Sequence, residues 1–171
     1  MDLKPLIRDV PDFPQPGILF RDITPLLKDP QAMRHVVDTF TEKYRGAGLD
    51  AIVSIESRGF LFGAPLALNL GLPLIPVRKP GKLPSRKMSV EYQLEYGTGS
   101  LDIHEDALMN GELVLIIDDL LATGGTAMAA AKLVELLGAR VHGFAFLVEL
   151  GFLSGRARLE GYDIFALANY E

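Results

Sequence analysis

Cysteine is absent from this chain of 171 residues. Without it the chain has no disulfide, no thiolate zinc site and no cysteine nucleophile, although the absence leaves the redox compartment open. Positive charge is also scarce: 17 lysine and arginine residues stand against 22 acidic ones, and the formal net charge is −5. This balance argues against a surface that coats nucleic acid. The three histidines, His35, His104 and His142, share no metal-ligand spacing, so we expect no protein-bound zinc.

Long uninterrupted apolar runs are lacking too. The first residues, MDLKPLIRDVPDFP, contain no apolar segment of the kind that signal peptides carry. A stretch without charge between Arg58 and Arg78 approaches the length of a membrane-spanning helix, but five residues interrupt it: Pro65, Asn69, Gly71, Pro73 and Pro76. We divide this stretch into a buried helix at 59–70 and a buried strand at 74–77. The prediction is a soluble, cytoplasmic protein with no membrane partner.

Hydrophobic residues make up 49% of the chain, which has neither an internal repeat nor a low-complexity linker. One domain spanning 1–171 is therefore expected. Residues 1–28 carry five prolines and are predicted to be an irregular arm, and Asp29 with Pro30 marks the start of a helix that Gly46 or Gly48 ends. Beyond this, the predicted order is strand 51–55, helix 59–70, strand 74–78, a two-stranded flap within 90–104, strand 113–117, helix 126–137, strand 141–148 and strand 162–166. The alternation predicts an α/β fold with a central parallel sheet flanked by helices.

The most informative segment is VLIIDDLLATGGT, at 114–126. A predicted strand ends in Asp118 and Asp119, and a turn of small residues follows before the next helix. Two adjacent carboxylates repel each other and are costly to bury unless a ligand or hydrogen-bond donors satisfy them. They can accept bonds from sugar hydroxyls, while N–H groups at a helix start can bind a phosphate. The segment therefore predicts a site for a phosphorylated sugar. It is no P-loop, because no lysine follows the glycines.

Two other polar turns follow predicted strands, so all three are expected at one edge of the sheet. One is Glu56-Ser57-Arg58-Gly59, which suits a pyrophosphate or, taken alone, an ordinary turn with a surface arginine. The other is a basic stretch that can close over a pyrophosphate and exclude water, and it carries Arg78, Lys79, Lys82, Arg86 and Lys87.

Two apolar or aromatic segments complete the candidate site. In the flap, Glu95 is a candidate for proton transfer with a base and Tyr96 for closing the site, although a hairpin glutamate by itself is ordinarily inert. The N-terminal segment FPQPGILFRDI is too apolar for a solvated tail. It is either a packing arm or a cover that stacks Phe20 on a flat ring.

The segment VLIIDDLLATGGT resembles the phosphoribosyl-pyrophosphate (PRPP) signature of type I phosphoribosyltransferases. Four further segments, FPQPGILFRDITPLL, IESRGFLFGAPLA, VRKPGKLP and LEYGTGSLDIHEDAL, are similar in sequence and order to the adenine phosphoribosyltransferases. The resemblance covers nearly the whole chain. It implies a type I phosphoribosyltransferase fold with a flexible loop and flap at 79–104 and an N-terminal hood at 1–28. It also implies transfer from PRPP to adenine, giving AMP and pyrophosphate in purine salvage.

The resemblance assigns roles to individual residues. It implies that Asp118 and Asp119 hold the ribose 2′- and 3′-hydroxyls, and that the loop of Ala122, Thr123, Gly124, Gly125 and Thr126 holds the 5′-phosphate. Four cationic residues would bind the pyrophosphate: Arg58, Arg78, Lys79 and Lys82. Phe20 would stack on adenine, while Leu19 and Arg21 contact it mainly through backbone groups. Glu95 and Arg58 would be catalytic, with Mg²⁺ carried by PRPP. A homodimer is also implied, with the 78–87 region near its interface.

Two alternatives stay open from the sequence. One is a phosphoribosyltransferase for a 6-oxopurine such as xanthine or hypoxanthine, whose cover loop would need donors where adenine needs acceptors. The other is a PRPP-sensing regulator without catalysis. Such regulators usually add a nucleic-acid-binding part, and no basic helix-turn-helix segment fits ahead of Asp29.

Overall fold

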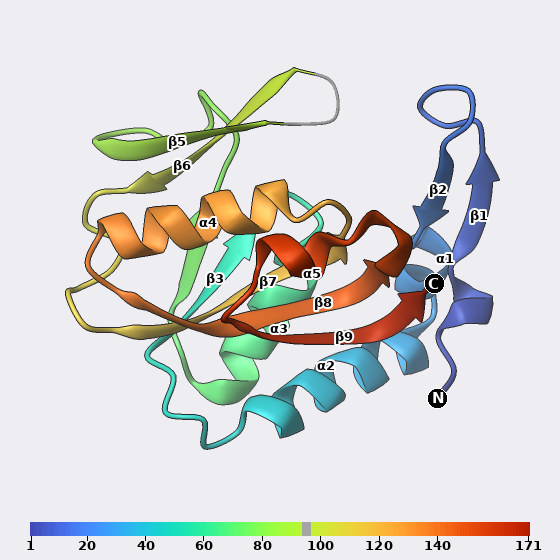
Figure 1. The fold of residues 1–171 in the computed structure, drawn as a ribbon. Coiled ribbons are helices and arrows are strands. Elements are labelled where there is room, and N and C mark those ends of the chain that lie inside the picture. The colour runs from blue at the N-terminus through green and yellow to red at the C-terminus, as the bar shows by residue number, and fades with distance from the viewer. Residues whose placement is uncertain (94–96) are drawn as a thin grey trace.

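Five parallel strands form the central sheet of the computed structural model, which describes residues 1–93 and 97–171 (Figure 1). Their order across the sheet is β4-β3-β7-β8-β9. The bounds are β3 (Ala51–Ile55), β4 (Leu74–Val77), β7 (Leu113–Leu121), β8 (Arg140–Leu150) and β9 (Asp163–Tyr170). All five residues of β3 are buried, as expected for a strand covered on both faces. The predicted parallel sheet flanked by helices is confirmed.

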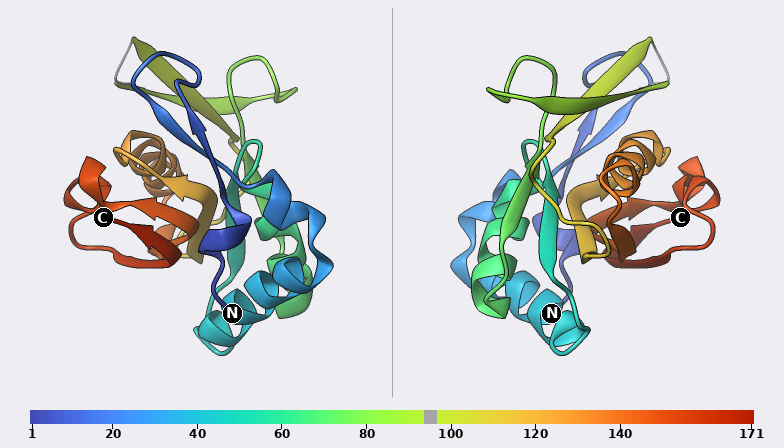
Figure 2. Two further views of the ribbon diagram at one scale, coloured as in Figure 1. Left: turned by 90° about the vertical axis from the view of Figure 1, so that its right-hand side faces the viewer. Right: turned by 90° about the vertical axis from the view of Figure 1, so that its left-hand side faces the viewer.

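Helices cover both faces of this sheet (Figure 2). On one side lie α2 (Pro30–Tyr44) and α3 (Phe60–Leu70), and on the other lies α4 (Gly125–Leu136). The start of α2 is as predicted, because the Asp29 carboxylate accepts the backbone N–H groups of Gln31 and Ala32 at 2.9 and 3.1 Å. The charge-free stretch divides into α3 and β4, as predicted. Among the described residues, no helix combines the length and apolarity needed to cross a membrane.

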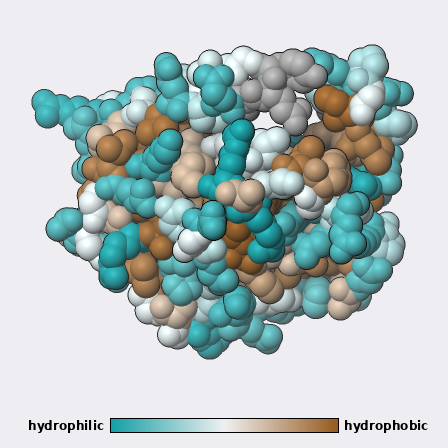
Figure 3. Space-filling model, viewed as in Figure 1, coloured by the Kyte–Doolittle hydropathy of each residue, from teal (hydrophilic) through white to brown (hydrophobic). Residues whose placement is uncertain are grey.

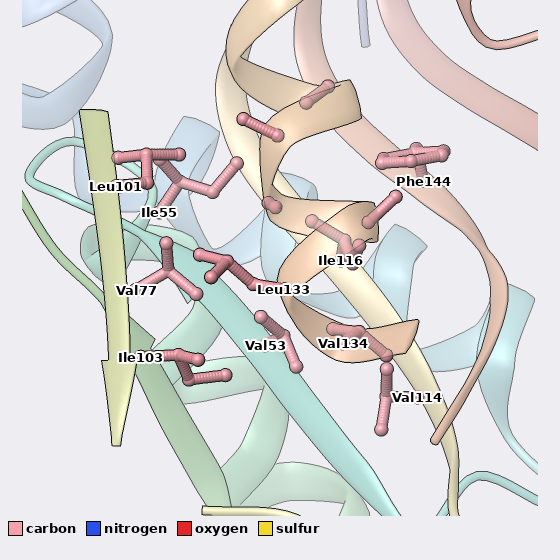
Figure 4. Close-up of a cluster of buried hydrophobic side chains, with 14 of the residues drawn as sticks. Val53, Ile55, Val77, Leu101, Ile103, Val114, Ile116, Leu133, Val134 and Phe144 are labelled. Atoms are coloured by element: carbon pink, nitrogen blue, oxygen red, sulfur yellow. The ribbon is translucent and has the colours of Figure 1, made fainter. Parts of the chain in front are cut away.

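A hydrophobic cluster joins α4 to the sheet (Figure 4). Leu133 and Val134 of α4 pack there with Val53 of β3 and Ile116 of β7, all fully buried. Leu101, from the flap, belongs to the same cluster. Part of the flap's second strand therefore belongs to the hydrophobic core. On the surface, hydrophobic and hydrophilic residues are interspersed across the face seen in Figure 3.

The predicted flap is an antiparallel hairpin of β5 (Lys87–Gln93) and β6 (Thr98–His104). Its first strand begins at Lys87, three residues earlier than expected. Arg78, just after β4, forms an isolated antiparallel bridge with Asp102 of β6. The flap is thus connected to the edge of the central sheet. Glu95 and Tyr96, predicted to act at the flap tip, lie outside the described residues.

The prediction of an irregular arm at 1–28 was wrong. The segment contains a short 3₁₀ helix η1 (Lys4–Leu6), an antiparallel hairpin of β1 (Arg8–Pro11) and β2 (Leu19–Asp22), and helix α1 (Thr24–Lys28). The prolines are compatible with this order because they sit at its boundaries. Pro11 ends β1, Pro14 and Pro16 lie in the hairpin loop, and Pro25 occupies the first turn of α1.

Two further differences concern the ends of strands. β7 does not stop at Ile117 but continues through the acidic pair to Leu121, in register with β8. The pair therefore belongs to a strand, where alternate side chains face opposite ways, and not to a turn. After β8, a 3₁₀ helix η2 (Gly151–Leu153) and a short helix α5 (Gly155–Arg158) precede β9. β4 is an edge strand of four residues and includes Pro76.

Candidate functional site

A cavity of about 620 Å³ lies where the predicted polar turns meet. The turn after β3 contributes Glu56, Ser57 and Arg58, and the segment at 118–127 forms a second wall. The remaining lining residues come from the loop after β4 and from the flap: Lys79, Pro80, Tyr92, Thr98, Gly99 and Ser100. The prediction that the loops at the carboxyl ends of the strands converge on one site is confirmed.

The acidic pair sits in the wall of this cavity in two different environments. Asp119 is 5% exposed, and its Oδ2 accepts a hydrogen bond from Arg58 Nε at 2.5 Å. Asp118 has no cation as direct partner among the described residues, and its Oδ1 accepts the N–H of Asp119 at 2.8 Å. Burial, together with the neighbouring charge of Asp119, raises the pKa of Asp118 well above its usual value. Burying the ionised Asp118 carboxylate therefore costs free energy, and a hydrogen-bond donor on a ligand would reduce this cost.

The loop after the acidic pair ends in two glycines at the start of α4. Gly124 has φ +80°, in the left-handed region that favours glycine, and Gly125 is the first residue of the helix. No side chain caps this helix start. The first N–H groups of α4 therefore have no helical acceptor and line the cavity wall, which suits an anion.

This loop, residues 122–126 and named the anion loop, rests directly on the backbone of α5. A Cβ added to Gly155 would lie 2.2 Å from the carbonyl oxygen of Ala122, and one added to Gly124 would lie 2.6 Å from the carbonyl oxygen of Gly155. Glu149, at the end of β8, accepts two hydrogen bonds from Arg156, at 2.6 and 2.8 Å, and so holds α5. The support of the anion loop by Gly155 was missed from the sequence, because the two segments are about thirty residues apart.

The predicted pyrophosphate cations are separated in the structure. Arg58 and Lys79 line the cavity, whereas Arg78 and Lys82 do not. Arg78 Nε donates to Glu56 Oε2 at 3.0 Å, and the same oxygen accepts the N–H of Lys79 at 2.8 Å. Glu56 therefore ties the basic loop to the turn after β3. Lys82 is exposed.

Asp102 holds both ends of the basic loop. Its backbone N–H and C=O pair with Arg78 at 2.7 and 2.9 Å, while its carboxylate contacts the Lys87 ammonium and accepts from Ser89 at 2.6 Å. Burial alone would raise the pKa of Asp102, but the bonds from Lys87 and Ser89 lower it below its ordinary value. The loop between Arg78 and Lys87 is thus closed on one buried residue, through its backbone at one end and its carboxylate at the other, a role that the sequence did not suggest.

The candidate base-binding residues Leu19, Phe20 and Arg21 are not among those that line the cavity. Phe20 is half-buried, its ring centroid 5.1 Å from that of Phe13 in an edge-to-face arrangement. The guanidinium carbon of Arg58 lies 5.6 Å from the Phe20 ring centroid. Leu19 is largely exposed, and the side chain of Arg21 is engaged elsewhere, with Asp9 and Tyr170. Arg58 therefore connects the aromatic arm to the acidic pair.

Tyr92 of β5 is a cavity residue that sequence reasoning passed over in favour of Tyr96. The Thr126 hydroxyl donates to the Tyr92 oxygen at 3.4 Å, a long contact between two residues that line the cavity. The ring lies over Gly99, where a Cβ would come within 2.7 Å of the ring carbon Cζ. The sequence offered one signal for this role: in the predicted hairpin, Tyr92 stands opposite a glycine, which leaves space for its ring. Tyr92 joins the flap to the anion loop.

Comparisons with known proteins agree with this geometry. The family model described as "Phosphoribosyl transferase domain" matches residues 23–164. An adenine phosphoribosyltransferase of Acaryochloris marina is 58% identical over 170 residues, covering 99% of this chain and 100% of that one. The crystal structure of the enzyme from Thermoanaerobacter pseudethanolicus has a TM-score of 0.95 at 55% identity, covering 98% of both chains. The Saccharomyces cerevisiae enzyme, complexed with adenine and an imino-altritol bisphosphate, has a TM-score of 0.91 at 43% identity, covering 96% of both chains.

Proposed function

The chain belongs to the adenine phosphoribosyltransferase family, and on that premise we propose how its residues form AMP and pyrophosphate from adenine and PRPP. One observation carries the assignment of roles: an acidic pair, an uncapped helix start and a cation share one cavity, with an aromatic ring beside that cation. These are the groups needed for ribose, phosphate, pyrophosphate and base. The reaction transfers a pentosyl group, so the site must hold all four without admitting water.

Asp118 and Asp119 accept the ribose hydroxyls, and the loop 122–126 binds the 5′-phosphate through backbone N–H groups. Asp118 is the better acceptor for a hydrogen bond from a ribose hydroxyl, since Asp119 already accepts one from Arg58. Displacement at the anomeric carbon develops positive charge on the sugar, as in glycoside chemistry. Two carboxylates beside that carbon favour this charge.

Arg58 and Lys79 stabilise the negative charge that leaves as pyrophosphate. Both line the cavity, and the exposed Lys79 has no carboxylate partner for its ammonium among the described residues. Arg78 acts indirectly: it donates to the Glu56 carboxylate, which in turn accepts the backbone N–H of Lys79. Lys82 contributes when the loop closes.

Phe20 stacks on adenine, and Leu19 and Arg21 contact the ring edge through backbone groups. The Arg21 side chain is directed to Tyr170, which leaves only its backbone for the base. Glu95 exchanges a proton with the purine, and Tyr96 closes the flap. Replacing Glu95 with glutamine tests the first role: turnover close to that of the original enzyme would contradict it.

Mg²⁺ enters as the ion that accompanies PRPP. The donor set fits it, because Asp118 and Asp119 place hard carboxylate oxygens in the cavity wall. Asp118 would hold the ion together with the substrate's own oxygens. When bound, Mg²⁺ supplies positive charge to the diphosphate leaving group.

A homodimer is the proposed assembly. The apolar helix α3 leaves Leu61 43% and Leu68 81% exposed, and these residues lie on one helical face seven positions apart. The helix follows Arg58 directly, so a second copy on this face would lie near the site. Sedimentation of the enzyme and of a Leu68→Glu variant tests the assembly: the variant is expected to be monomeric. The cytoplasmic location stays a prediction from the sequence.

Product formation from Mg²⁺–PRPP with adenine, hypoxanthine and xanthine in turn tests the function. AMP formation with adenine as the preferred base is expected. Preference for hypoxanthine would favour the 6-oxopurine alternative. Binding of PRPP without any AMP formation would favour the sensing regulator.

A further inference from the structure

The N-terminal hairpin presents different side chains on its two faces. In its register Arg21 is opposite Asp9 and Phe20 is opposite Val10. Opposed residues of an antiparallel pair share a face, and successive residues of a strand alternate. Phe20 therefore faces Arg58 and the site, and Arg21 faces away from it. What holds Arg21 also sets the direction in which Phe20 points.

Arg21 is held by the last strand of the chain. Its guanidinium carbon lies 3.9 Å from the centroid of the Tyr170 ring, and its Nη1 forms an ion pair with Asp9. The Arg21 side chain is only 13% exposed, so it is largely out of water, while Tyr170 is half-buried. Lys4 Nζ lies 5.2 Å from the centroid of the same ring. Two cations of the N-terminal segment thus converge on one aromatic residue.

Tyr170 itself is fixed by the central sheet. It is the last residue of β9 and is in register with Leu150 of β8. The contact between the Arg21 guanidinium and the Tyr170 ring places the end of β9 within side-chain reach of the β1–β2 hairpin. An isolated two-stranded hairpin is marginally stable, so its direction depends on what it docks against. The ring of Tyr170 provides a rigid surface for that docking.

We propose that Tyr170 is a positioning residue for the purine: by stacking on Arg21 it orients β2 so that Phe20 covers the base. The inference rests on the proposed stacking of adenine on Phe20. It assigns to the penultimate residue of the chain a part in base affinity, while ribose and phosphate binding are independent of it. Those parts of the ligand are held by the segment 118–126, on the other side of Arg58.

The test compares two ligands that differ only in the base. Calorimetric affinities for AMP and for ribose 5-phosphate are measured on the full-length enzyme, on Tyr170→Leu and on Tyr170→Phe. Tyr170→Leu removes the aromatic face, and we expect AMP to bind about ten-fold more weakly, a change of about 1.4 kcal/mol that lies within the range of a partly desolvated cation–π contact. Ribose 5-phosphate affinity should not change. Tyr170→Phe keeps the ring and should restore AMP affinity.

A Phe20→Leu variant separates failure of this inference from failure of the proposed site. If Phe20→Leu weakens AMP binding but Tyr170→Leu does not, the role of Tyr170 is refuted and the stacking role of Phe20 stands. If Phe20→Leu leaves AMP affinity unchanged, the proposed base site is wrong, and with it this inference. Equal losses for AMP and ribose 5-phosphate in Tyr170→Leu would show general damage and would also refute it. In a double variant, Arg21→Met with Tyr170→Leu, the stacking contact is already lost through Tyr170→Leu. Adding Arg21→Met then removes only the ion pair with the exposed Asp9, so the AMP affinity should fall by much less than it does for Arg21→Met alone.

Discussion

Replacing Gly155 with alanine tests whether α5 supports the anion loop. The new Cβ would lie 2.2 Å from the carbonyl oxygen of Ala122, where real Cβ contacts essentially never fall below 3.0 Å. The loop and α5 must therefore move apart by about 0.8 Å. Both groups are backbone, so no side-chain rotation relieves the overlap. The displacement acts on the segment that we propose holds the 5′-phosphate.

The expected cost has two parts. Overpacking of this kind destabilises a fold by about 1–3 kcal/mol, and for a chain of this size each kcal/mol lowers Tm by roughly 2–4 °C. A misplacement of about 1 Å can lower the rate about 100-fold. We therefore expect kcat/KM for PRPP to fall by about 10- to 100-fold, measured by AMP formation at saturating adenine and well below Tm.

Gly151→Ala is the matched control, in the same connection between β8 and β9. Its Cβ would lie 3.2 Å from the carbonyl oxygen of Tyr170, which a small shift can accommodate, and it does not touch the anion loop. It should leave kcat/KM for PRPP unchanged. An unchanged kcat/KM in Gly155→Ala, or an equal loss in both variants, would refute the reasoning.

Three further changes probe the acidic residues. Because the pKa of Asp118 is raised, the folded state holds this proton more tightly than the unfolded state does, and the free energy of unfolding falls as pH rises from about 3.8 through the raised pKa. Asp118→Asn should therefore make stability less dependent on pH and raise Tm at pH 8. A lower Tm at pH 8 would contradict this. The pKa of Asp102 is lowered, so the effect has the opposite sign: the stabilisation is present above the ordinary pKa of 3.8 and is lost as pH falls through the lowered value. Asp102→Asn should lower the free energy of unfolding by about 1–3 kcal/mol at pH 7, because Lys87 loses its carboxylate partner. In urea denaturation, the difference in this free energy between the variant and the original protein should become smaller in acid. Asp119→Asn should change stability by less than about 1 kcal/mol, since Arg58 is 44% exposed, while PRPP affinity and kcat both fall; unchanged kcat would leave Asp119 only the role of holding hydroxyls.

Features encoded within a few residues were predicted well. The Asp29-Pro30 start of α2 and the strand Ala51–Ile55 follow from capping chemistry and from a short apolar run. The convergence of the turn at 56–59 with the segment 118–126 also followed from the sequence, because parallel strands bring their carboxyl ends to one edge. Local chemistry and topology together were enough to locate the cavity.

Features that depend on distant partners were not predicted. Arg58 and Asp119 are 61 positions apart, and nothing near either residue announces their ion pair. The contact of Gly155 with Ala122 is equally invisible before the chain folds. The N-terminal hairpin was missed for another reason: prolines disfavour strand interiors, but here they lie at the end of β1 and in the hairpin loop, where they are compatible with strand pairing. Side-chain partnership and strand pairing are properties of the folded chain.

The edge strand β4 has a consequence for the behaviour of this protein at high concentration. An exposed strand edge can pair with another molecule and begin a growing β-aggregate. Here the edge is only four residues long, Pro76 removes one donor from it, and Arg78 just beyond it is already paired with Asp102. The β4 edge of the sheet is thereby a poor template for such growth.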